Sequence, residues 1–467
     1  MKVHLAGIAG TAMASLAGLL REAGHEVTGS DQDVYPPMST QLAALGIPVR
    51  SPYAEANIPL DADTIVIGNA LSRGNPEVEA VLDRRLPFTS APALLADAFI
   101  RGRTSLVVAG THGKTTTTSL LAFLLHRAGV DPSFLIGGVP VDFERSYRLG
   151  GGPHFIVEGD EYDTAFFDKR PKFVHYLPDI AIIGNLEYDH ADIYPDLAAV
   201  QTAFLRLMNV IPRRGVLIAG IESPALVELL PKAFCRVETF GIGVDADWQA
   251  EDVKATATGA SFRLVQRTSA GRLGHGLFES RLSGEHNVRN ALAALAAANA
   301  AGVSPAAVRD AVAEFKGVKR RLELRGTARG VSVYDDFAHH PTAVRVTLEA
   351  VRQGAPARVI AVFEPRSYTS RTRVFQDDFA KAFDAADLVL VAAAHLPEKV
   401  PVGQRLSEQD LVAGIAARGK AAEFVPTVAA IVDRVAGVVR DGDRVVVLSN
   451  GGFGGIHEKL LGALEGV

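Results

Sequence analysis

Residues 106–118 constrain the fold of this chain more than any other stretch, because they read LVVAGTHGKTTTT. An apolar run followed by glycines, a lysine and threonines is typical of a strand that turns directly into a helix. Gly110 and Gly113 allow backbone N–H groups to approach an anion. Lys114 supplies a positive charge, and the Thr115 hydroxyl can bind Mg2+. The stretch therefore predicts an α/β sheet with a phosphate-binding loop for a nucleoside triphosphate.

The loop departs from the common GxxxxGK(S/T) pattern at Val108, where that pattern has glycine. A glycine-rich turn before a helix can also be a plain tight connection, but a strand followed by GTHGKTTTT favours phosphate binding. We expect the nucleotide to contact Gly110, Thr111, His112, Gly113, Lys114, Thr115 and Thr116.

The composition indicates several domains without a strongly charged surface. With 467 residues, 48% of them hydrophobic, the chain has material for two or three cores. A net charge of −5 gives no bulk positive field, so we expect no nucleic acid and no membrane as partners. Because Cys235 is the one cysteine in the sequence, the chain cannot form an intramolecular disulfide. The apolar neighbours of Cys235 predict a buried thiol. MKVHLAGIAG is unlike a secretory signal, so we expect a cytoplasmic protein.

The first hundred residues predict a Rossmann-like unit. We expect a strand at residues 2–6, a turn at 7–10 and a helix at 11–23. Asp31 ends the next strand, about where an acidic residue meets a ribose in dinucleotide-binding folds. The glycine pattern GIAGTA is too incomplete to establish NAD, but the free N–H groups of the helix still favour a diphosphate.

Two breaks in the pattern predict three α/β domains. One break lies at Gly102, and a basic segment, FKGVKRRLELRG, makes the other near Val318. We expect a Rossmann-like domain at 1–101, a central P-loop ATPase-like domain with a parallel sheet at 102–318, and a C-terminal Rossmann-like domain at 319–467. Within the central domain, residues 245–283 alternate like antiparallel strands, and 287–301 form an alanine-rich helix.

Two central strands end in polar clusters, HFIVEGDEYD and IAIIGNLEYDHADIY. In a parallel sheet such clusters meet the phosphate loop at the carboxyl ends of the strands. Glu158 is well placed to bind Mg2+. The neighbouring Asp160, Glu161 and Asp163 leave open which carboxylate binds, and a solvated acidic loop is the alternative.

Histidines and an asparagine pair provide further candidates. His190 is either a metal ligand or a structural histidine. The consecutive His339 and His340 point in opposite directions in an extended segment, so we do not expect them to ligate one ion together. Asn287 and Asn290 share a helix face and could contact the nucleotide, although Asn287 could instead cap the helix.

Two arginines lie at the second boundary. Arg320 and Arg321 could bind a γ-phosphate or belong to a solvated linker, and arginine is favoured where an anion is bound through two hydrogen bonds.

Six motifs together resemble the ATP-dependent Mur ligases of peptidoglycan synthesis. In chain order they are AGTHGKTTT, VEGDEYD, NLEYDHADIY, GEHNVRNALAA, VKRRLELRG and YDDFAHHPT. The resemblance covers nearly the whole chain. THGKTTT, YDDFAHHPT and the N-terminal GIAGTAM are similar to the branch that acts on UDP-N-acetylmuramate, whose first domain holds the UDP group.

Further stretches, including EYDTAFFDKRPKFVHY and SNGGFGGIH, are similar to recycling members of the family. Those members join UDP-N-acetylmuramate to the murein tripeptide L-alanyl-γ-D-glutamyl-meso-diaminopimelate. The alternative is the member that adds L-alanine in de novo synthesis, which typically has ESDASF where this chain has EYDTAF. The resemblance implies ATP as cosubstrate, Mg2+ as cofactor and two small-molecule substrates, and it leaves the oligomeric state open.

The resemblance also implies residue roles. The catalytic residues would be Lys114, Glu158, His190, Arg321 and Asp336. Thr115, Glu158 and His190 would hold the metal, and Asn287, Asn290, Arg321 and Asp336 would complete the nucleotide site. The UDP substrate would contact Gly7, Gly10, Thr11, Ala12, Met13, Asp31 and Asn69, and Arg366 is our candidate for a peptide carboxylate. Several Mur ligases use a carbamylated lysine after the histidine, but residues 190–206 contain no lysine.

The implied reaction activates the lactyl carboxylate as an acyl phosphate, which the peptide amine then displaces. A nucleotide-sensing protein is the alternative from another class: the loop would only switch conformation, and the first domain would bind a UDP-sugar. Substrate-dependent release of ADP separates the two.

Overall fold

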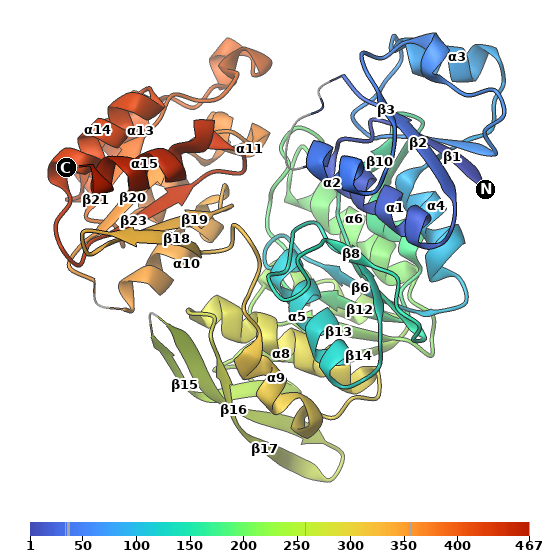
Figure 1. Cartoon of the computed structure of the whole chain (residues 1–467). Helices are drawn as coiled ribbons and strands as arrows, with labels where there is room; N and C mark the ends of the chain where they lie inside the picture. Colours follow the sequence, from blue (N-terminus) through green and yellow to red (C-terminus); the bar gives the residue numbers. More distant parts are fainter. Residues whose placement is uncertain (33, 35–37, 257, 355, 467) are drawn as a thin grey trace.

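The computed structural model describes residues 1–32, 34, 38–256, 258–354 and 356–466. They form three α/β units, each built around its own main sheet (Figure 1). In Figure 1 the N-terminal unit is blue, the C-terminal unit is orange to red, and the central unit lies between and below them. The predicted α/β class is therefore confirmed, while the three domain boundaries stay a prediction.

The N-terminal unit is a parallel five-stranded sheet in the order β3-β2-β1-β4-β5. Its strands are β1 (Lys2–Ala6), β2 (Glu26–Ser30), β3 (Val49–Arg50), β4 (Thr64–Ile67) and β5 (Phe88–Ser90). Its helices are α1 (Thr11–Glu22), α2 (Met38–Ala44), α3 (Pro76–Asp83) and α4 (Ala91–Leu95). The turn from β1 into α1 requires a positive φ at Gly7, which glycine adopts without strain. The Rossmann-like prediction agrees with this arrangement.

The central unit is a ten-stranded sheet in the order β17-β16-β15-β14-β13-β12-β6-β9-β7-β8. Its strands are β6 (Thr104–Ala109), β7 (Ser133–Leu135), β8 (Tyr147–Arg148), β9 (His154–Glu158), β12 (Ile180–Ile183), β13 (Val216–Gly220), β14 (Arg236–Ile242), β15 (Trp248–Thr256), β16 (Gly259–Thr268) and β17 (Gly271–Ser280). Strands β7, β9, β6, β12, β13, β14 and β15 pair in parallel. The antiparallel pairs β15–β16 and β16–β17 confirm the prediction for 245–283.

Helices α5 (Lys114–Arg127) and α8 (Glu285–Ala300) share one apolar core with this sheet. Six of the nine buried residues of α8 are alanines, whose small side chains let the helix backbone approach its neighbours closely. The remaining elements of the unit are α6 (Leu197–Asn209), α7 (Pro224–Val227), α9 (Arg309–Glu314) and a small hairpin of β10 (Asp163–Ala165) and β11 (Asp168–Pro171). This hairpin was not predicted from the sequence.

The C-terminal unit has six strands in the order β18-β19-β23-β20-β21-β22. They are β18 (Glu323–Ala328), β19 (Val331–Asp336), β20 (Val359–Phe363), β21 (Leu388–Val391), β22 (Ala421–Phe424) and β23 (Arg444–Leu448). The helices are α10 (Pro341–Arg352), α11 (Tyr368–Arg371), α12 (Gln376–Ala382), α13 (Glu408–Ala417), α14 (Val428–Val438) and α15 (Ile456–Glu465). The two edge strands, β18 and β22, were not predicted, because they are short, partly exposed and lack a run of large apolar residues.

Two smaller findings concern surface and membrane. Cys235 is only half-buried, so the prediction of a buried thiol was wrong in extent; its partial burial still raises the pKa of the thiol. Within the described ranges, the helices are too short or too polar to cross a bilayer.

Candidate functional site

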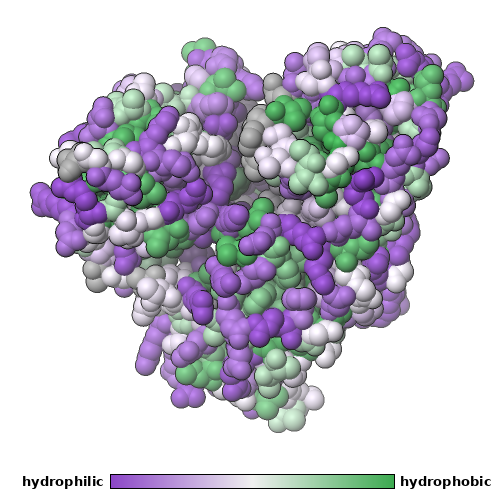
Figure 2. Space-filling view, in the orientation of Figure 1, coloured by the Kyte–Doolittle hydropathy of each residue, from purple (hydrophilic) through white to green (hydrophobic). Residues whose placement is uncertain are grey.

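A cleft of about 1650 Å³ lies where the central unit meets the C-terminal unit. In Figure 2 the surface is hollowed beside the C-terminal lobe. The carboxyl ends of β6, β9 and β12 open toward this cleft, because their following segments line it. The predicted residues that line it are Thr111, His112, Gly113, Lys114, Thr115, Thr116, Glu158, His190, Asn287, Asn290, Arg321 and Asp336.

The phosphate loop connects β6 to α5. Gly113 precedes α5 with a φ of 81°, and a Cβ there would lie 2.4 Å from Oδ1 of Asn290, so only glycine fits. The first amides of α5 line the cleft, where a helix N-terminus favours an anion. Gly110 does not line the cleft. Its carbonyl instead accepts a hydrogen bond from Nζ of Lys114 at 2.7 Å, so Gly110 helps to orient the lysine side chain without lining the cleft itself.

Lys114 forms the charged centre of the cleft with Glu161. Its Nζ lies 2.9 Å from Oε2 of Glu161, and Glu161 also lies 3.1 Å from Nε2 of His190 through Oε1. Burial alone lowers the pKa of Lys114, but the charges of Glu161 and Asp160 and the hydrogen bond to Glu161 together raise it above its ordinary value. Burial likewise lowers the pKa of His190, but the hydrogen bond to Glu161 and the charges of Glu161 and Asp189 together raise it above its ordinary value. Glu161, which we did not single out, therefore links the two predicted residues.

Thr115 and Glu158 lie together as predicted for a metal site. The Thr115 hydroxyl donates to Oε1 of Glu158 at 3.0 Å, and the amide of Gly137 donates to Oε2 at 2.8 Å. Burial raises the pKa of Glu158, because a buried carboxylate favours its neutral form. These hard oxygen atoms suit Mg2+.

Arg321, which lies beyond the second predicted domain boundary, reaches the Thr115–Glu158 pair. Its NH2 donates to Oγ1 of Thr115 at 3.0 Å, and its guanidinium lies 5.0 Å from the ring centre of Phe337. Arg320 turns away: its NH2 donates to the carbonyls of Ser449 and Gly451, both at 2.7 Å. The two arginines therefore separate into one that faces the cleft and one that holds the C-terminal unit together.

Asp336 lines the cleft at the end of β19. Its carboxylate accepts from the amides of Leu322 at 2.6 Å and Ala338 at 2.8 Å, and burial raises its pKa. The carboxylate therefore fixes the segment that carries Arg321.

The asparagine pair lies at the start of α8. Oδ1 of Asn290 accepts from the Thr117 hydroxyl at 3.1 Å, and its Nδ2 donates to Oδ1 of Asn287 at 3.1 Å. The capping alternative for Asn287 is wrong, because α8 begins earlier and Gly284 is its N-cap. Asn287 instead donates to the carbonyl of Ser283 at 2.8 Å.

Polar contacts between the two units complete the cleft. The Thr342 hydroxyl donates to Oε2 of Glu187 at 2.6 Å, and the Thr369 hydroxyl donates to Oδ1 of Asp189 at 2.8 Å. Sequence reasoning missed these contacts, because each joins residues more than 150 positions apart.

A second pocket of about 450 Å³ lies between the N-terminal and central units. Its lining includes the predicted residues Gly7, Gly10, Thr11, Ala12, Met13, Asp31 and Asn69. Asp31 accepts from the amide of Ala9 at 2.8 Å and from the Tyr53 hydroxyl at 2.9 Å, so its carboxylate has a fixed orientation. Lys172, from the central unit, also lines this pocket, and its Nζ donates to Asp160 of the large cleft at 2.6 Å. This ion pair joins the two pockets.

Arg366 lines neither pocket. Its guanidinium packs on the backbone of Gly451, where a Cβ would overlap it, and its NH1 lies 3.6 Å from Oε1 of Glu364. Its role toward a peptide carboxylate stays a prediction.

Known proteins resemble this chain over its whole length. The family model described as Mur ligase family, catalytic domain, matches residues 2–103; the Mur ligase middle domain matches 108–298; and the Mur ligase, glutamate ligase domain matches 320–451. A UDP-N-acetylmuramate–L-alanyl-γ-D-glutamyl-meso-2,6-diaminoheptandioate ligase of Escherichia coli is 45% identical over 99% of this chain and 98% of its own. A UDP-N-acetylmuramate–L-alanine ligase of Solibacter usitatus is 35% identical over 99% of this chain and 95% of its own.

Solved structures agree. A murein peptide ligase from Psychrobacter arcticus is 38% identical, with a TM-score of 0.75 over 100% of this chain and 99% of that one. A UDP-N-acetylmuramate–alanine ligase from Thermotoga maritima has a TM-score of 0.81 at 24% identity, over 100% and 99% of the two chains, and it supports the fold alone.

Proposed function

The chain belongs to the Mur ligase family, and from this premise we propose that it is an ATP-dependent ligase joining UDP-N-acetylmuramate to L-alanyl-γ-D-glutamyl-meso-diaminopimelate in cell-wall recycling. The 45% identity to the Escherichia coli ligase over nearly both chains carries this proposal. The L-alanine-adding relative, at 35%, supports the rival substrate less strongly. We assign the reaction to the cytoplasm, which supplies ATP.

The large cleft suits ATP. The N-terminus of α5 and the Lys114 ammonium can neutralise the β- and γ-phosphates. Thr115 and Glu158 would hold Mg2+, with His190 as the further predicted ligand, and the ion would offset phosphate charge when bound. Arg321 adds a second cation from the C-terminal side.

The second pocket suits the UDP group. The N-terminus of α1 begins there and Gly10, its N-cap, carries no side chain, so a diphosphate can approach the free amides. We assign the ribose to Asp31, whose carboxylate is already oriented. The Lys172–Asp160 pair supports placing the lactyl carboxylate between the two pockets, because Lys172 provides a cation there.

The first chemical step joins two anions. An oxygen of the lactyl carboxylate attacks the γ-phosphorus, the bond to ADP breaks, and an acyl phosphate forms. Lys114 and Arg321 lower the repulsion between these groups and align them.

In the second step the peptide amine attacks the acyl carbon, the bond to phosphate breaks, and the amide forms as the amine loses a proton. The reference pKa of an α-amine is about 7.7 to 8.0, so part of it is neutral at pH 7. No strong base is needed, and His190 or a nearby carboxylate can accept the proton.

The mass of the product tests the proposal. The protein is incubated with UDP-N-acetylmuramate, ATP and Mg2+, and with either the tripeptide or L-alanine. We expect ligation chiefly with the tripeptide, and Lys114→Ala protein sets the background. Preferential use of L-alanine would favour the rival ligase. Binding of ATP without substrate-dependent release of ADP would favour the nucleotide-sensing alternative.

A further inference from the structure

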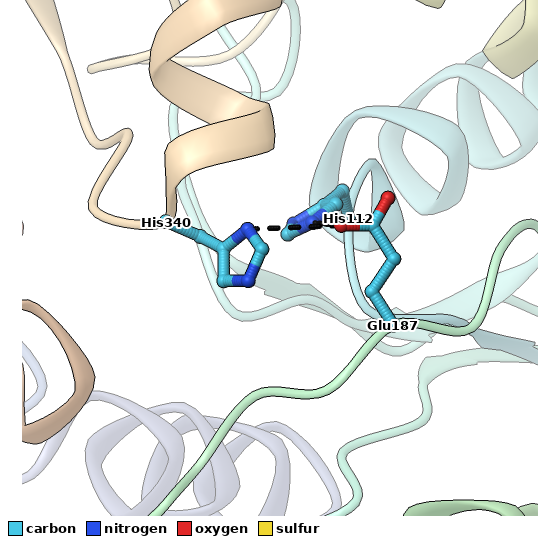
Figure 3. A group of neighbouring side chains, drawn as sticks. All are labelled: His112, Glu187 and His340. Atoms are coloured by element: carbon cyan, nitrogen blue, oxygen red, sulfur yellow. Dashed lines mark hydrogen bonds and ion pairs between the residues drawn. The ribbon is translucent and has the colours of Figure 1, made fainter. Parts of the chain in front are cut away.

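Three side chains that take no part in the two chemical steps converge where the central and C-terminal units meet (Figure 3). His112 comes from the phosphate loop, Glu187 from the segment after β12, and His340 from the residue before α10. We call them the His–Glu–His cluster. All three line the large cleft. They lie apart from the Thr115–Glu158 pair that we assign to Mg2+.

The spacing of the cluster is close to that of a metal site. Nε2 of His112 lies 3.3 Å from Oε2 of Glu187, and Nδ1 of His340 lies 3.8 Å from the same oxygen. All three atoms lie within 4.8 Å of one another. A tetrahedral ion bound at about 2.0 to 2.1 Å would separate its ligand atoms by about 3.3 to 3.4 Å. Small side-chain adjustments would therefore bring all three atoms onto one ion.

Neighbouring groups already orient two of the ligands. Nε2 of His340 lies 3.1 Å from the carbonyl of Tyr188, which can accept its proton and leave Nδ1 unprotonated. The Thr342 hydroxyl donates to Oε2 of Glu187 at 2.6 Å. Hydrogen bonds of this kind commonly fix the tautomer and orientation of metal-binding histidines and carboxylates. The Thr342 amide also approaches Nδ1 of His340 at 3.3 Å, and this long bond is the contact that an ion would replace.

The protonation states suit the same chemistry. Although burial opposes it, the contacts of Glu187 with His112 and Thr342 lower the pKa of the carboxyl to about 2. Burial lowers the pKa of His340 to about 4, so its imidazole is neutral at pH 7. Metal ligation needs an ionised carboxylate and neutral imidazoles.

We propose that the His–Glu–His cluster binds a divalent transition-metal ion of the zinc class, separate from the Mg2+ that accompanies ATP. Two imidazoles and one carboxylate suit Zn2+ and its neighbours, whereas Mg2+ prefers oxygen ligands and retained water. Three protein ligands leave a position open toward the cleft. Because His340 belongs to the C-terminal unit and the other ligands to the central unit, the ion ties the two units together.

The test uses the full-length protein, stripped of metal by a chelator and held in saturating Mg2+. Co2+ serves as a spectroscopic probe, and Zn2+ is the competitor. We expect one Co2+ per chain with the strong visible absorption of a four-coordinate ion, displaced by Zn2+. Binding of Zn2+ should also raise the melting temperature, because an ion that binds only the folded state stabilises it.

Three ligand variants and two controls locate the ion. His112→Asn, Glu187→Gln and His340→Asn should each weaken Co2+ binding at least tenfold; asparagine at 340 can still cap α10. His339→Asn is the matched control, because Nδ1 of His339 lies against the carbonyl of Phe337 and outside the cluster. It should bind Co2+ like the parent protein.

His190→Asn is the second control, because among the described residues His190 forms a further group that could hold a metal, with Asp160 and Glu161. If this variant alone loses Co2+, the ion lies in that group and the proposal is wrong. Unchanged binding in all three ligand variants would also overturn it. Melting curves in chelator show which variants are folded, and any folded ligand variant decides the question.

Discussion

The central unit meets its two neighbours through different kinds of surface. Toward the N-terminal unit, one apolar core is continuous: Leu16 and Leu19 of α1 belong to the same buried cluster as Tyr147 and Phe155. Toward the C-terminal unit, the buried clusters of that unit contain only its own residues. Apolar burial stabilises the first interface in proportion to area, and reopening it would expose that area to water.

Alongside the ring contact of Tyr188 with Phe375, at 5.8 Å between ring centres, the second interface has polar contacts that water can replace. They join Arg321 to Thr115, Thr342 to Glu187 and Thr369 to Asp189. Interfaces of this kind within a chain commonly allow domain motion. We therefore expect the C-terminal unit to open for ATP and peptide, while the N-terminal unit stays fixed.

The largest effect is expected at the charged centre of the cleft. Lys114→Ala removes the cation that faces the phosphates, so turnover should fall by about 10³-fold, the upper range for loss of one electrostatic contact. Binding of UDP-N-acetylmuramate, measured by calorimetry, should change little because that pocket lies at the other interface. Lys169→Ala, at an exposed lysine of the β10–β11 hairpin, is the matched control. If a folded Lys114→Ala protein loses both turnover and binding of UDP-N-acetylmuramate, the assignment of ATP and the UDP group to separate pockets is wrong.

The apolar interface should be sensitive to one added methyl group. A Cβ at Gly18 of α1 would lie 2.1 Å from the Tyr147 ring, so Gly18→Ala forces the two units apart. We expect a loss of about 1 to 3 kcal/mol in the free energy of unfolding, measured with denaturant. Gly462→Ala in α15 meets no atom within 4 Å and should be neutral or slightly stabilising. Equal effects of the two changes would show that the N-terminal interface is not tightly packed.

Acid should lower the free energy of unfolding through one histidine in the N-terminal sheet and one at the interface with the C-terminal unit. Burial lowers the pKa of His4, in the N-terminal sheet, and of His340, at the polar interface, to about 4 each. Between pH 6.5 and 4 the unfolded chain binds more protons than the folded one, so stability falls as pH falls. Each histidine contributes up to about 1.4 kcal/mol per pH unit. Denaturant titrations at pH 7 and 5 should therefore show a shallower pH dependence in His4→Asn and in His340→Asn.

The smallest effect is expected from a single polar contact between the units. Thr369→Val removes the hydrogen bond to Asp189, which is worth about 1 kcal/mol in the closed arrangement. The KM for ATP should rise about fivefold while the melting temperature stays nearly unchanged. Thr202→Val, at an exposed position of α6, is the matched control. A large drop in melting temperature would instead mean that the polar interface supports the fold.

Local patterns predicted much of this molecule. The strand, glycine turn and helix of the phosphate loop are encoded in consecutive residues, and β6 and α5 follow that prediction closely. The edge strands β18 and β22 were missed, since an edge strand is stabilised by pairing with its neighbour and needs no apolar run of its own. The capping alternative for Asn287 is wrong for a related reason: the start of α8 depends on Gly284, whose backbone conformation no pattern specifies.

The sequence by itself determined which residue types the cleft contains, since charge, glycine freedom and apolar periodicity are local properties. Only the tertiary structure decided how they pair. It brought Lys114 to Glu161 and placed His112 beside His340 across two units. The reason is distance along the chain: parallel strands bring their carboxyl ends together only after the sheet forms, so contacts between those ends depend on strand order and register.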